Sequence, residues 1–406
     1  MVARVNDTPI GVLGAGQLSR MLAEAAGPLG LHVLALGEKA DDPASEFAEI
    51  ILGKLDDEAA LGQLFDRAKT IVLENEFVDC AALERAGKPL GVRFVPALDA
   101  ISVVQDKLGQ KRLLASAQVP SAPWIARETG EAPAAFVERA RQAFGPRFVL
   151  KWARLGYDGK GVFLGEEGRA ADAAAFCARA DERGIEVFAE QRVVFKRELA
   201  MVGALSVRGK FVHWPLVVSR QENGICRTVS GPASGLGVPP SIEVQAAQAC
   251  ERVARALELH GVFAIEFFET DGGELLANEI APRVHNSGHY TQDASRTSQF
   301  ENHWRAVLGR ELGETTSAPG FVMVNLIGPP GVSRPVGPRD LPEPLRRGKT
   351  HWYGKRELRD GRKMGHLNAE VASASDVPAL VKELEEARSK WESRVMSSVE
   401  GTRGSQ

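Results

Sequence analysis

Short apolar runs alternate with helical apolar spacing over the first hundred residues. Four runs have the length and side chains of buried strands, at residues 9–13, 31–36, 50–52 and 70–73. Between them, residues 18–26 and 57–68 place apolar side chains three and four positions apart, as amphipathic helices do. This βαβ alternation predicts a parallel sheet in an N-terminal Rossmann-like α/β domain, residues 1–98.

Strands predominate in the middle of the chain, where the pattern becomes α+β. Strands are expected at residues 148–152, 161–164, 187–191, 198–207 and 211–218, and helices at 102–117, 170–183, 241–259 and 299–308. We therefore expect a central α+β domain, residues 99–300, with a lid subdomain at about 121–190. Pro and Gly crowd residues 329–347, which predicts a loop before a small terminal unit beginning at Thr350, within a C-terminal domain of residues 301–406.

One predicted hairpin carries two glutamates at matching positions. Residues 262–269 and 274–280 are apolar strands joined by a turn at 270–273, so their pairing brings Glu266 and Glu279 nearly opposite each other. Two adjacent anions repel each other unless a cation lies between them. Magnesium prefers oxygen ligands and usually shares its coordination with substrate phosphates. The hairpin therefore predicts a site for a metal-bound nucleotide.

Composition narrows the class of protein. At 406 residues the chain exceeds what one hydrophobic core usually serves, and its net charge of −3 argues against wholesale binding of nucleic acid or anionic membranes. The four cysteines show no C-x-x-C spacing, as expected for reduced thiols rather than a disulfide framework or a zinc site. No apolar run approaches the ~20 residues that span a bilayer, and residues 1–8 lack a signal-peptide apolar region, so we expect a cytoplasmic protein.

A glycine-rich turn follows the first strand. Gly14, Gly16 and Ser19 form a G-x-G-x-x-S pattern between a strand and a helix, where backbone N–H groups and the helix dipole favour an anion. The third glycine of a dinucleotide fingerprint is missing, and Glu38 is the only acidic candidate for a ribose contact near the second strand. A role in binding a phosphorylated substrate is therefore favoured over a dinucleotide.

Charged residues follow two of the predicted strands. Glu74 and Glu76 lie after residues 70–73, where open α/β sheets place ligands, although a solvated loop is the alternative. Lys151 is followed by the glycine-rich loop 156–161, whose amides can pack against phosphate oxygens. For that loop alone an ordinary hairpin turn is the alternative.

Further polar residues surround the same expected nucleotide site. Lys107 precedes a helix at the domain boundary, where a second lysine can neutralise phosphate charge. Glu190 and Gln191 end a strand and, with Glu198, offer acceptors for an adenine amino group and ribose hydroxyls. Each of these features alone is a weak signal, and together with the hairpin they favour a nucleotide site.

These features resemble the ATP-grasp fold, in which two α+β subdomains hold ATP between them and carboxylate-bound magnesium bridges its phosphates. The resemblance covers nearly the whole chain and narrows at residues 14–18, 156–161, 278–289 and 361–368. These segments look like the motifs of the N5-carboxyaminoimidazole ribonucleotide synthase family, ATP-dependent carbon–nitrogen ligases of purine biosynthesis. The resemblance implies an N-terminal pre-ATP-grasp domain, a homodimer, and carboxylation of 5-aminoimidazole ribonucleotide with ATP and bicarbonate through carboxyphosphate.

The resemblance also implies roles for individual residues. For ATP these are Lys107, Lys151, Gly156, Tyr157, Asp158, Gly159, Lys160, Gly161, Glu190, Gln191, Arg192, Val193, Glu198, Gln221, Asn278 and Glu279. For the ribonucleotide they are Gln17, Leu18, Glu76, Tyr157, Asp158, Lys355, Arg362 and Lys363. The residues with implied catalytic roles are Lys151, Arg283, His285 and Asn286. The implied ligands of Mg²⁺, or Mn²⁺, are Glu266 and Glu279. The glycine-rich loop is expected to close as a lid.

Two positions depart from the family pattern. Many relatives have an aromatic residue before the first glutamate of the E-x-E pair and Asn-Val after the second, where this chain has Leu73, Phe77 and Val78. A histidine expected near the nucleotide is replaced by Gln221, which can donate a hydrogen bond but cannot carry a proton as imidazole does.

Other functions stay open on the sequence alone. Another ATP-grasp ligase, such as formate-dependent glycinamide ribonucleotide transformylase, would share the nucleotide site and activate a different carboxylate. An NAD-binding oxidoreductase would use the glycine turn, and a catalytically silent regulator would bind a nucleotide without turnover. A zinc site at His285 and His289 lacks a third soft ligand nearby, so a polar loop beside the substrate is favoured.

Overall fold

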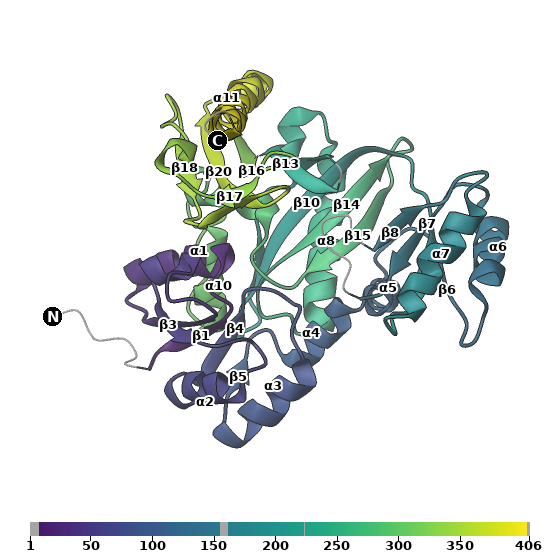
Figure 1. Cartoon of the computed structure of the whole chain (residues 1–406), viewed down its shortest axis with the longest axis horizontal. Helices are drawn as coiled ribbons and strands as arrows, with labels where there is room; N and C mark the ends of the chain where they lie inside the picture. The colour runs from purple at the N-terminus through teal and green to yellow at the C-terminus, as the bar shows by residue number, and fades with distance from the viewer. Residues whose placement is uncertain (1–7, 155–160, 223, 404–406) are drawn as a thin grey trace.

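Two smaller α/β units flank a long central sheet (Figure 1). The structure is a computed structural model, and it describes residues 8–154, 161–222 and 224–403. Among these residues, no helix combines the length and the apolar character needed to cross a membrane.

The N-terminal unit is a five-stranded parallel sheet in the order β3-β2-β1-β4-β5. Its elements are β1 (Ile10–Leu13), α1 (Gln17–Ala26), β2 (Val33–Gly37), β3 (Glu49–Leu52), α2 (Glu58–Arg67), β4 (Thr70–Leu73), α3 (Cys80–Gly87) and β5 (Arg93–Phe94). The predicted parallel sheet is confirmed. Because parallel strands end at the same edge, the turn after β1 lies beside the residues that follow β4.

Two helices connect this unit to the rest of the chain, where the pattern predicted one. The single helix expected at 102–117 is wrong: α4 (Leu98–Gln105) ends at Asp106, and α5 (Lys107–Ser116) begins anew. Asp106 has extended backbone angles, and its Oδ1 accepts a hydrogen bond from Leu108 N at 2.9 Å, as an N-cap does. The break places Lys107 at the start of α5.

The subdomain expected to be a lid, called the lid below, is a four-stranded antiparallel sheet within its described residues, in the order β6-β9-β7-β8. Its elements are β6 (Trp124–Ala126), α6 (Pro133–Phe144), β7 (Phe148–Trp152), β8 (Val162–Leu164), α7 (Ala170–Asp181) and β9 (Val187–Gln191). Both helices lie on one side of the sheet, at the right of Figure 1, and Phe136, Phe148 and Phe176 form its core with them.

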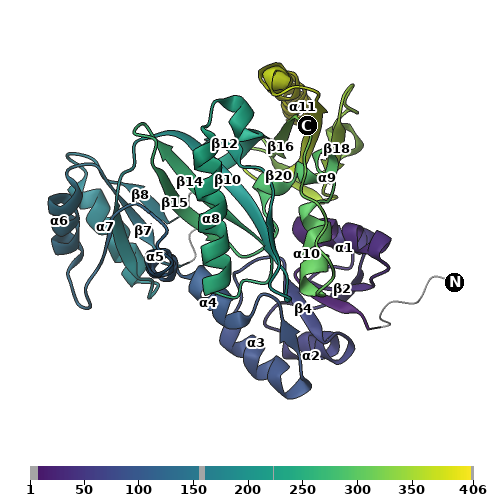
Figure 2. The same ribbon diagram turned by 180° about the vertical axis from the view of Figure 1, so that it is seen from behind.

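The central sheet has nine strands. They follow the order β15-β14-β10-β12-β13-β16-β20-β18, with β11 paired to β10. Its first elements are β10 (Phe195–Leu205), β11 (Phe211–His213), β12 (Val217–Glu222), β13 (Ile225–Gly231), α8 (Pro240–Ala256), β14 (Gly261–Thr270) and β15 (Leu275–Ala281). The single strand expected at 211–218 is split because Pro215 has no N–H to continue the ladder along β10. The helix α8 packs across β10 (Figure 2).

The C-terminal strands are hydrogen-bonded to the central sheet, and the first of them begins before Thr350. The remaining elements are α9 (Thr291–Ala294), α10 (Gln299–Val307), β16 (Gly320–Ile327), β17 (Ser333–Pro335), β18 (Lys349–Trp352), β19 (Glu357–Arg359), β20 (Lys363–Val371) and α11 (Val377–Arg403). Strand β17 lies inside the region expected to be a loop and pairs with β19, which lies beyond that region. One continuous ladder therefore links the Glu266/Glu279 hairpin to the C-terminal cations.

Candidate active site

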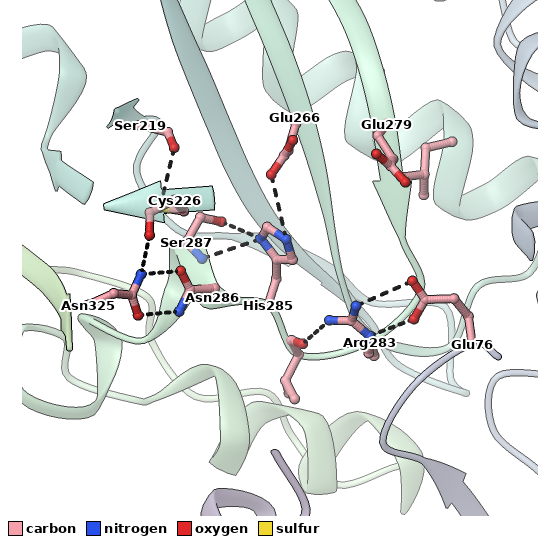
Figure 3. A network of polar contacts seen from close by, with 12 residues as sticks. Glu76, Ser219, Cys226, Glu266, Glu279, Arg283, His285, Asn286, Ser287 and Asn325 are labelled. Carbon is pink, nitrogen blue, oxygen red and sulfur yellow. Dashed lines mark hydrogen bonds and ion pairs between the residues drawn. The ribbon is translucent and has the colours of Figure 1, made fainter. Parts of the chain in front are cut away.

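Glu266 and Glu279 face each other across the β14–β15 ladder. They are direct partners in its antiparallel register, and a bulge between Glu266 and Phe267 follows the pair. Glu266 points toward His285 (Figure 3), whose Nε2 lies 3.7 Å from Glu266 Oε1. The hairpin and the facing glutamates predicted from the sequence are therefore confirmed.

The two glutamates differ in their electrostatic surroundings. Burial, with the charges of Glu279 and Glu198, raises the pKa of Glu266 to about 7. Burial would also raise the pKa of Glu279, but the ion pair with Lys107 outweighs it, and that pKa is lowered. His285 does not balance Glu266, because burial lowers the pKa of its imidazole to about 3 and leaves the ring neutral near pH 7. Glu266 is thus the carboxylate at which a bound cation would relieve most repulsion.

Oxygen-bearing side chains gather beside Glu266. The recess next to it is lined by Glu198, Ser219, Gln221 and Asn278. Burial raises the pKa of Glu198 as well. Three residues predicted for the nucleotide site therefore lie together with the predicted metal ligand.

The two lysines predicted to bind the nucleotide lie close to the hairpin. Lys107 is on α5, and Lys151 is on β7 of the lid. Lys107 pairs with Glu279, and Lys151 Nζ lies 3.3 Å from Asn278 Oδ1 and 2.8 Å from Glu190 Oε2. Glu190 is only 4% exposed, and its Oε1 lies 2.6 Å from the buried Lys111 Nζ. The prediction that Glu190 accepts from adenine or ribose disagrees with this placement, because both of its oxygens are ion-paired inside the protein.

The segment after β15 joins the hairpin to the N-terminal sheet. Arg283 forms an ion pair with Glu76, with 2.6 Å between Nε and Oε2 (Figure 3). His285 Nδ1 lies 2.9 Å from Ser287 Oγ. The structure therefore places His285 beside Glu266 and pairs Arg283 with Glu76, three residues that the resemblance assigned to the substrate or to catalysis.

Two buried amides hold this segment in place. Gln299 accepts from His285 N at 2.9 Å and donates to the His285 carbonyl at 2.8 Å. Asn286 and Asn325 of β16 exchange two hydrogen bonds, at 3.0 and 2.7 Å (Figure 3). These bonds link the Asn286 side chain to β16 and use one N–H and one lone pair of its amide, so a second donor and acceptor remain and its catalytic role stays a prediction.

His289 is fully buried in the core. Its Nδ1 accepts from Gln299 Nε2 at 3.0 Å, and its ring packs 5.0 Å from that of His366. In the described part of the chain, no three His, Cys, Asp or Glu side chains are grouped to hold a metal. Nothing in this arrangement supports the zinc alternative.

The glycine turn after β1 already holds an anion. Gly16 N and Leu18 N donate to the two oxygens of Glu74 at 2.7 and 3.1 Å. A Cβ on Gly16 would lie 2.3 Å from Glu74 Oε1, so only glycine admits the carboxylate so closely. The phosphate site predicted at this turn is therefore wrong in this structure: Glu74 occupies the helix N-terminus. Leu18 is used in the same contact, whereas Gln17 accepts from Lys355 Nζ.

The three predicted C-terminal cations lie where the central sheet meets the N-terminal unit. Lys355 also donates to the Lys363 carbonyl at 2.7 Å, and Lys363 is near enough to Glu266 to lower its pKa. Arg362 donates to the Glu357 carbonyl at 3.2 Å. Burial lowers the pKa of Arg362, and the charge of Asp42 opposes that shift.

Some predicted residues are placed only in part. Gly156, Tyr157, Asp158, Gly159 and Lys160 lie outside the described residues. Gly161 begins the return to β8, and its carbonyl accepts from Trp152 N at 2.9 Å. Gln191 ends β9 exposed, and Arg192 and Val193 follow it.

Three residues of this site were not predicted from the sequence. They are Lys111, Gln299 and Asn325. Lys111 follows Lys107 by four positions, so its place on the same helix face could have been read from the spacing. Asn325 interrupts the apolar run of β16, and a polar residue in such a run usually has a buried partner. Gln299 carries no comparable signal.

This fold and this arrangement of charges define an ATP-grasp enzyme. Family models match residues 8–105 as a ribonucleotide synthetase preATP-grasp domain, 112–300 as an ATP-grasp domain and 322–379 as a phosphoribosylaminoimidazole carboxylase C-terminal domain. The chain belongs to the N5-carboxyaminoimidazole ribonucleotide synthase family and is an ATP-dependent ligase. Relatives with that name are 38% identical in Brucella melitensis, over 88% of this chain and 95% of theirs, and 37% identical in Synechococcus elongatus, over 90% of each.

Solved structures agree with this assignment. The N5-carboxyaminoimidazole ribonucleotide synthetase of Thermus thermophilus is 34% identical with a TM-score of 0.79, covering 95% of this chain and 98% of its own. The Aspergillus clavatus enzyme in complex with ADP and 5-aminoimidazole ribonucleotide is 27% identical with a TM-score of 0.82, covering 94% and 99%. These matches do not favour the transformylase alternative.

Proposed function

We propose that the chain carboxylates 5-aminoimidazole ribonucleotide with ATP and bicarbonate, through carboxyphosphate, giving N5-carboxyaminoimidazole ribonucleotide, ADP and phosphate. The observation that carries the proposal is the facing pair of glutamates, one held by Lys107 and one with a pKa raised to about 7. Support comes from the relatives with this name and from the Aspergillus clavatus structure with ADP and 5-aminoimidazole ribonucleotide.

Magnesium fits the residues present. Glu266 and Glu279 supply two carboxylates, and Mg²⁺ usually takes one or two together with substrate phosphates. The recess beside Glu266 adds oxygen donors from Ser219, Gln221 and Asn278. When bound, the ion would supply positive charge to the phosphates during transfer. Mn²⁺ has the same preference for oxygen ligands.

The lysines and Arg283 are placed to bind the transferred phosphoryl group. Lys107 and Lys151 keep 15% and 16% of their side chains exposed, so their ammonium groups remain accessible although each is ion-paired. In the proposed step, a bicarbonate oxygen attacks the γ-phosphorus and the bond to the ADP oxygen breaks. Lys151 and Arg283 offset the charge that builds on the phosphoryl oxygens.

The second step needs the ribonucleotide beside the same residues. The exocyclic amine attacks the carbonyl carbon of carboxyphosphate, or of carbon dioxide released from it, and the leaving phosphate takes up the proton that the amine loses. Neutral His285 can hold the reactants by hydrogen bonding without adding a charge. Glu76, Gln17, Lys355, Arg362 and Lys363 would surround the ribonucleotide, with Lys355 and Arg362 on its phosphate. Closure of the loop 156–161 over this intermediate, which water hydrolyses, stays a prediction.

One assay tests the reaction. ADP release by the purified chain should require bicarbonate and 5-aminoimidazole ribonucleotide together. Formate with glycinamide ribonucleotide should give no ADP above background. ADP release with that second pair would replace the proposal by the transformylase, and no ADP with either pair would favour a silent nucleotide-binding protein.

Nucleotide preference gives an independent test. Mg–ATP should raise the melting temperature because it binds only the folded state, and NADH should not. A rise with NADH alone would revive the dinucleotide alternative. The domain limits at 98 and 300, the homodimer and the cytoplasmic location also stay predictions, and light scattering would test the homodimer.

A further inference from the structure

Lys111 lies behind the predicted ATP lysines and is itself sealed from solvent. Its side chain is 3% exposed, one helical turn after Lys107 on α5. Its Nζ lies 2.6 Å from Glu190 Oε1, whereas Lys151 Nζ lies 2.8 Å from Glu190 Oε2. The carboxylate of Glu190 therefore links two lysines: Lys111, which is too buried to reach a ligand, and Lys151, which is partly exposed.

The charge balance of this group depends on Lys111. Glu190 and Lys151 alone would form a neutral pair, whose attraction for phosphate is largely cancelled. With Lys111 included, the three side chains carry one net positive charge. Burial lowers the pKa of Lys111, and the pKa of Glu190 is lowered by its two lysines against the effect of burial. A buried charge is retained in a protein only when it is paired in this way.

We propose that Lys111 is a positioning residue of the nucleotide site. It holds Glu190 by one oxygen so that the other oxygen fixes Lys151 Nζ, and it offsets the charge of Glu190 so that Lys151 attracts phosphate with a full positive charge. Lys111 acts through Glu190 and touches no substrate. This inference rests on the proposed role of Lys151 as a phosphate ligand.

The test removes the charge of Lys111 and measures nucleotide binding directly. Lys111→Met should weaken the binding of Mg–ADP in calorimetry by about tenfold, which is the effect of one interaction worth about 1.4 kcal/mol. The KM for ATP should rise similarly, and the KM for 5-aminoimidazole ribonucleotide should not change. Arg112→Met is the matched control, because Arg112 is the next residue on α5 and is exposed. It should bind Mg–ADP as the wild type does.

A double variant separates charge balance from a merely structural role. Lys111→Met combined with Glu190→Gln restores one net positive charge and keeps an oxygen for Lys151. It should bind Mg–ADP within about threefold of the wild type, under 0.7 kcal/mol. If the single variant does not fold, the double variant still tests the inference, because Glu190→Gln removes the buried negative charge that Lys111 balanced and Mg–ADP binding within about threefold of the wild type is again expected.

Three outcomes would overturn the inference. They are unchanged nucleotide binding in folded Lys111→Met, an equal loss for ATP and ribonucleotide, or a double variant as weak as the single one. Because Mg–ADP binding needs neither bicarbonate nor ribonucleotide, these outcomes are distinct from failure of the proposed reaction. A wild type that binds Mg–ADP but does not turn over would contradict the proposed function alone.

Discussion

Glu190 and Glu266 are two carboxylates at the same nucleotide site, and their protonation equilibria are shifted in opposite directions. Glu190 lies on β9 of the lid between two lysines, which lower the pKa of its carboxyl. Glu266 lies on β14 of the central sheet beside Glu279 and Glu198, and its pKa is raised to about 7. Burial alone would raise both values, so the difference comes from the neighbouring charges.

The opposite pKa shifts distinguish a carboxylate that is ion-paired inside the protein, Glu190, from a carboxylate that can bind a ligand cation, Glu266. The negative charge of Glu190 is already compensated, so it organises the protein whether or not a substrate is bound. The charge of Glu266 has only a neutral histidine within ion-pair distance among the described residues, so it gains most from a cation that arrives with the substrate. The same contrast applies to the cations: Lys151 is held by Glu190, whereas Arg362 takes part in no ion pair within the described chain.

The largest expected effect is on turnover in Glu279→Gln. This change removes one of the two facing anions at nearly constant volume, so kcat should fall about a hundred- to a thousandfold, the scale of losing one preorganised electrostatic contact at a transition state. Glu266→Gln should act similarly. Turnover and the melting temperature would be measured together at limiting Mg²⁺. Near-normal turnover would mean that the hairpin is only structural.

A smaller effect is expected on the unfolding free energy, which should fall in Glu190→Gln and not in Glu266→Gln. Glu190→Gln leaves the buried Lys111 and the partly exposed Lys151 without their anion and should lower the unfolding free energy by about 3 kcal/mol, as removal of one partner of a buried ion pair does. Glu266→Gln should not destabilise the metal-free protein, because it removes repulsion. Urea midpoints of both variants would decide this. Equal losses of unfolding free energy in the two variants would contradict the proposed difference between Glu190 and Glu266.

Arg362→Ala extends the comparison to a cation that forms no ion pair within the described residues and is proposed to bind the phosphate of the ribonucleotide. The KM for 5-aminoimidazole ribonucleotide should rise about ten- to a hundredfold, since a charged hydrogen bond contributes roughly 1.5–3 kcal/mol. The KM for ATP should change little. Steady-state kinetics with each substrate varied in turn would show it. A loss confined to ATP would place Arg362 away from the ribonucleotide.

The smallest expected effect is the pH dependence of the metal-free protein. The pKa of Glu266 is raised from about 4.5 to about 7, so its contribution to stability is fully present below pH 4.5 and is lost as the pH rises through 7. Relative to Glu266→Gln, the wild type should lose about 1–2 kcal/mol between pH 5 and pH 8, after a discount for partial solvent exposure. Melting temperatures in EDTA across this range would test it, and the wild type losing nothing would contradict it.

Much of this site could be predicted because its chemistry depends on local patterns. The hairpin is encoded by two apolar runs around a turn, and pairing such runs fixes which side chains face each other, so Glu266 and Glu279 followed directly. The parallel sheet, the lid strands and the nearness of Arg283 and His285 to the hairpin followed in the same way. What the patterns did not show was the partner of each polar group: Glu74 fills the helix N-terminus expected for phosphate, and Asn286 bonds Asn325.

The sequence by itself determined the elements, the facing glutamates and the residues available for ATP. Only the tertiary structure decided which charges are compensated from within the protein. Lys111 and Glu190 are 79 positions apart, and Asn286 and Asn325 are 39 apart. Their pairing depends on how the lid, α5 and the C-terminal strands pack, and no local spacing encodes that packing. A pKa or a free hydrogen-bonding group is a property of all neighbours in space, so it appears only when the chain is folded.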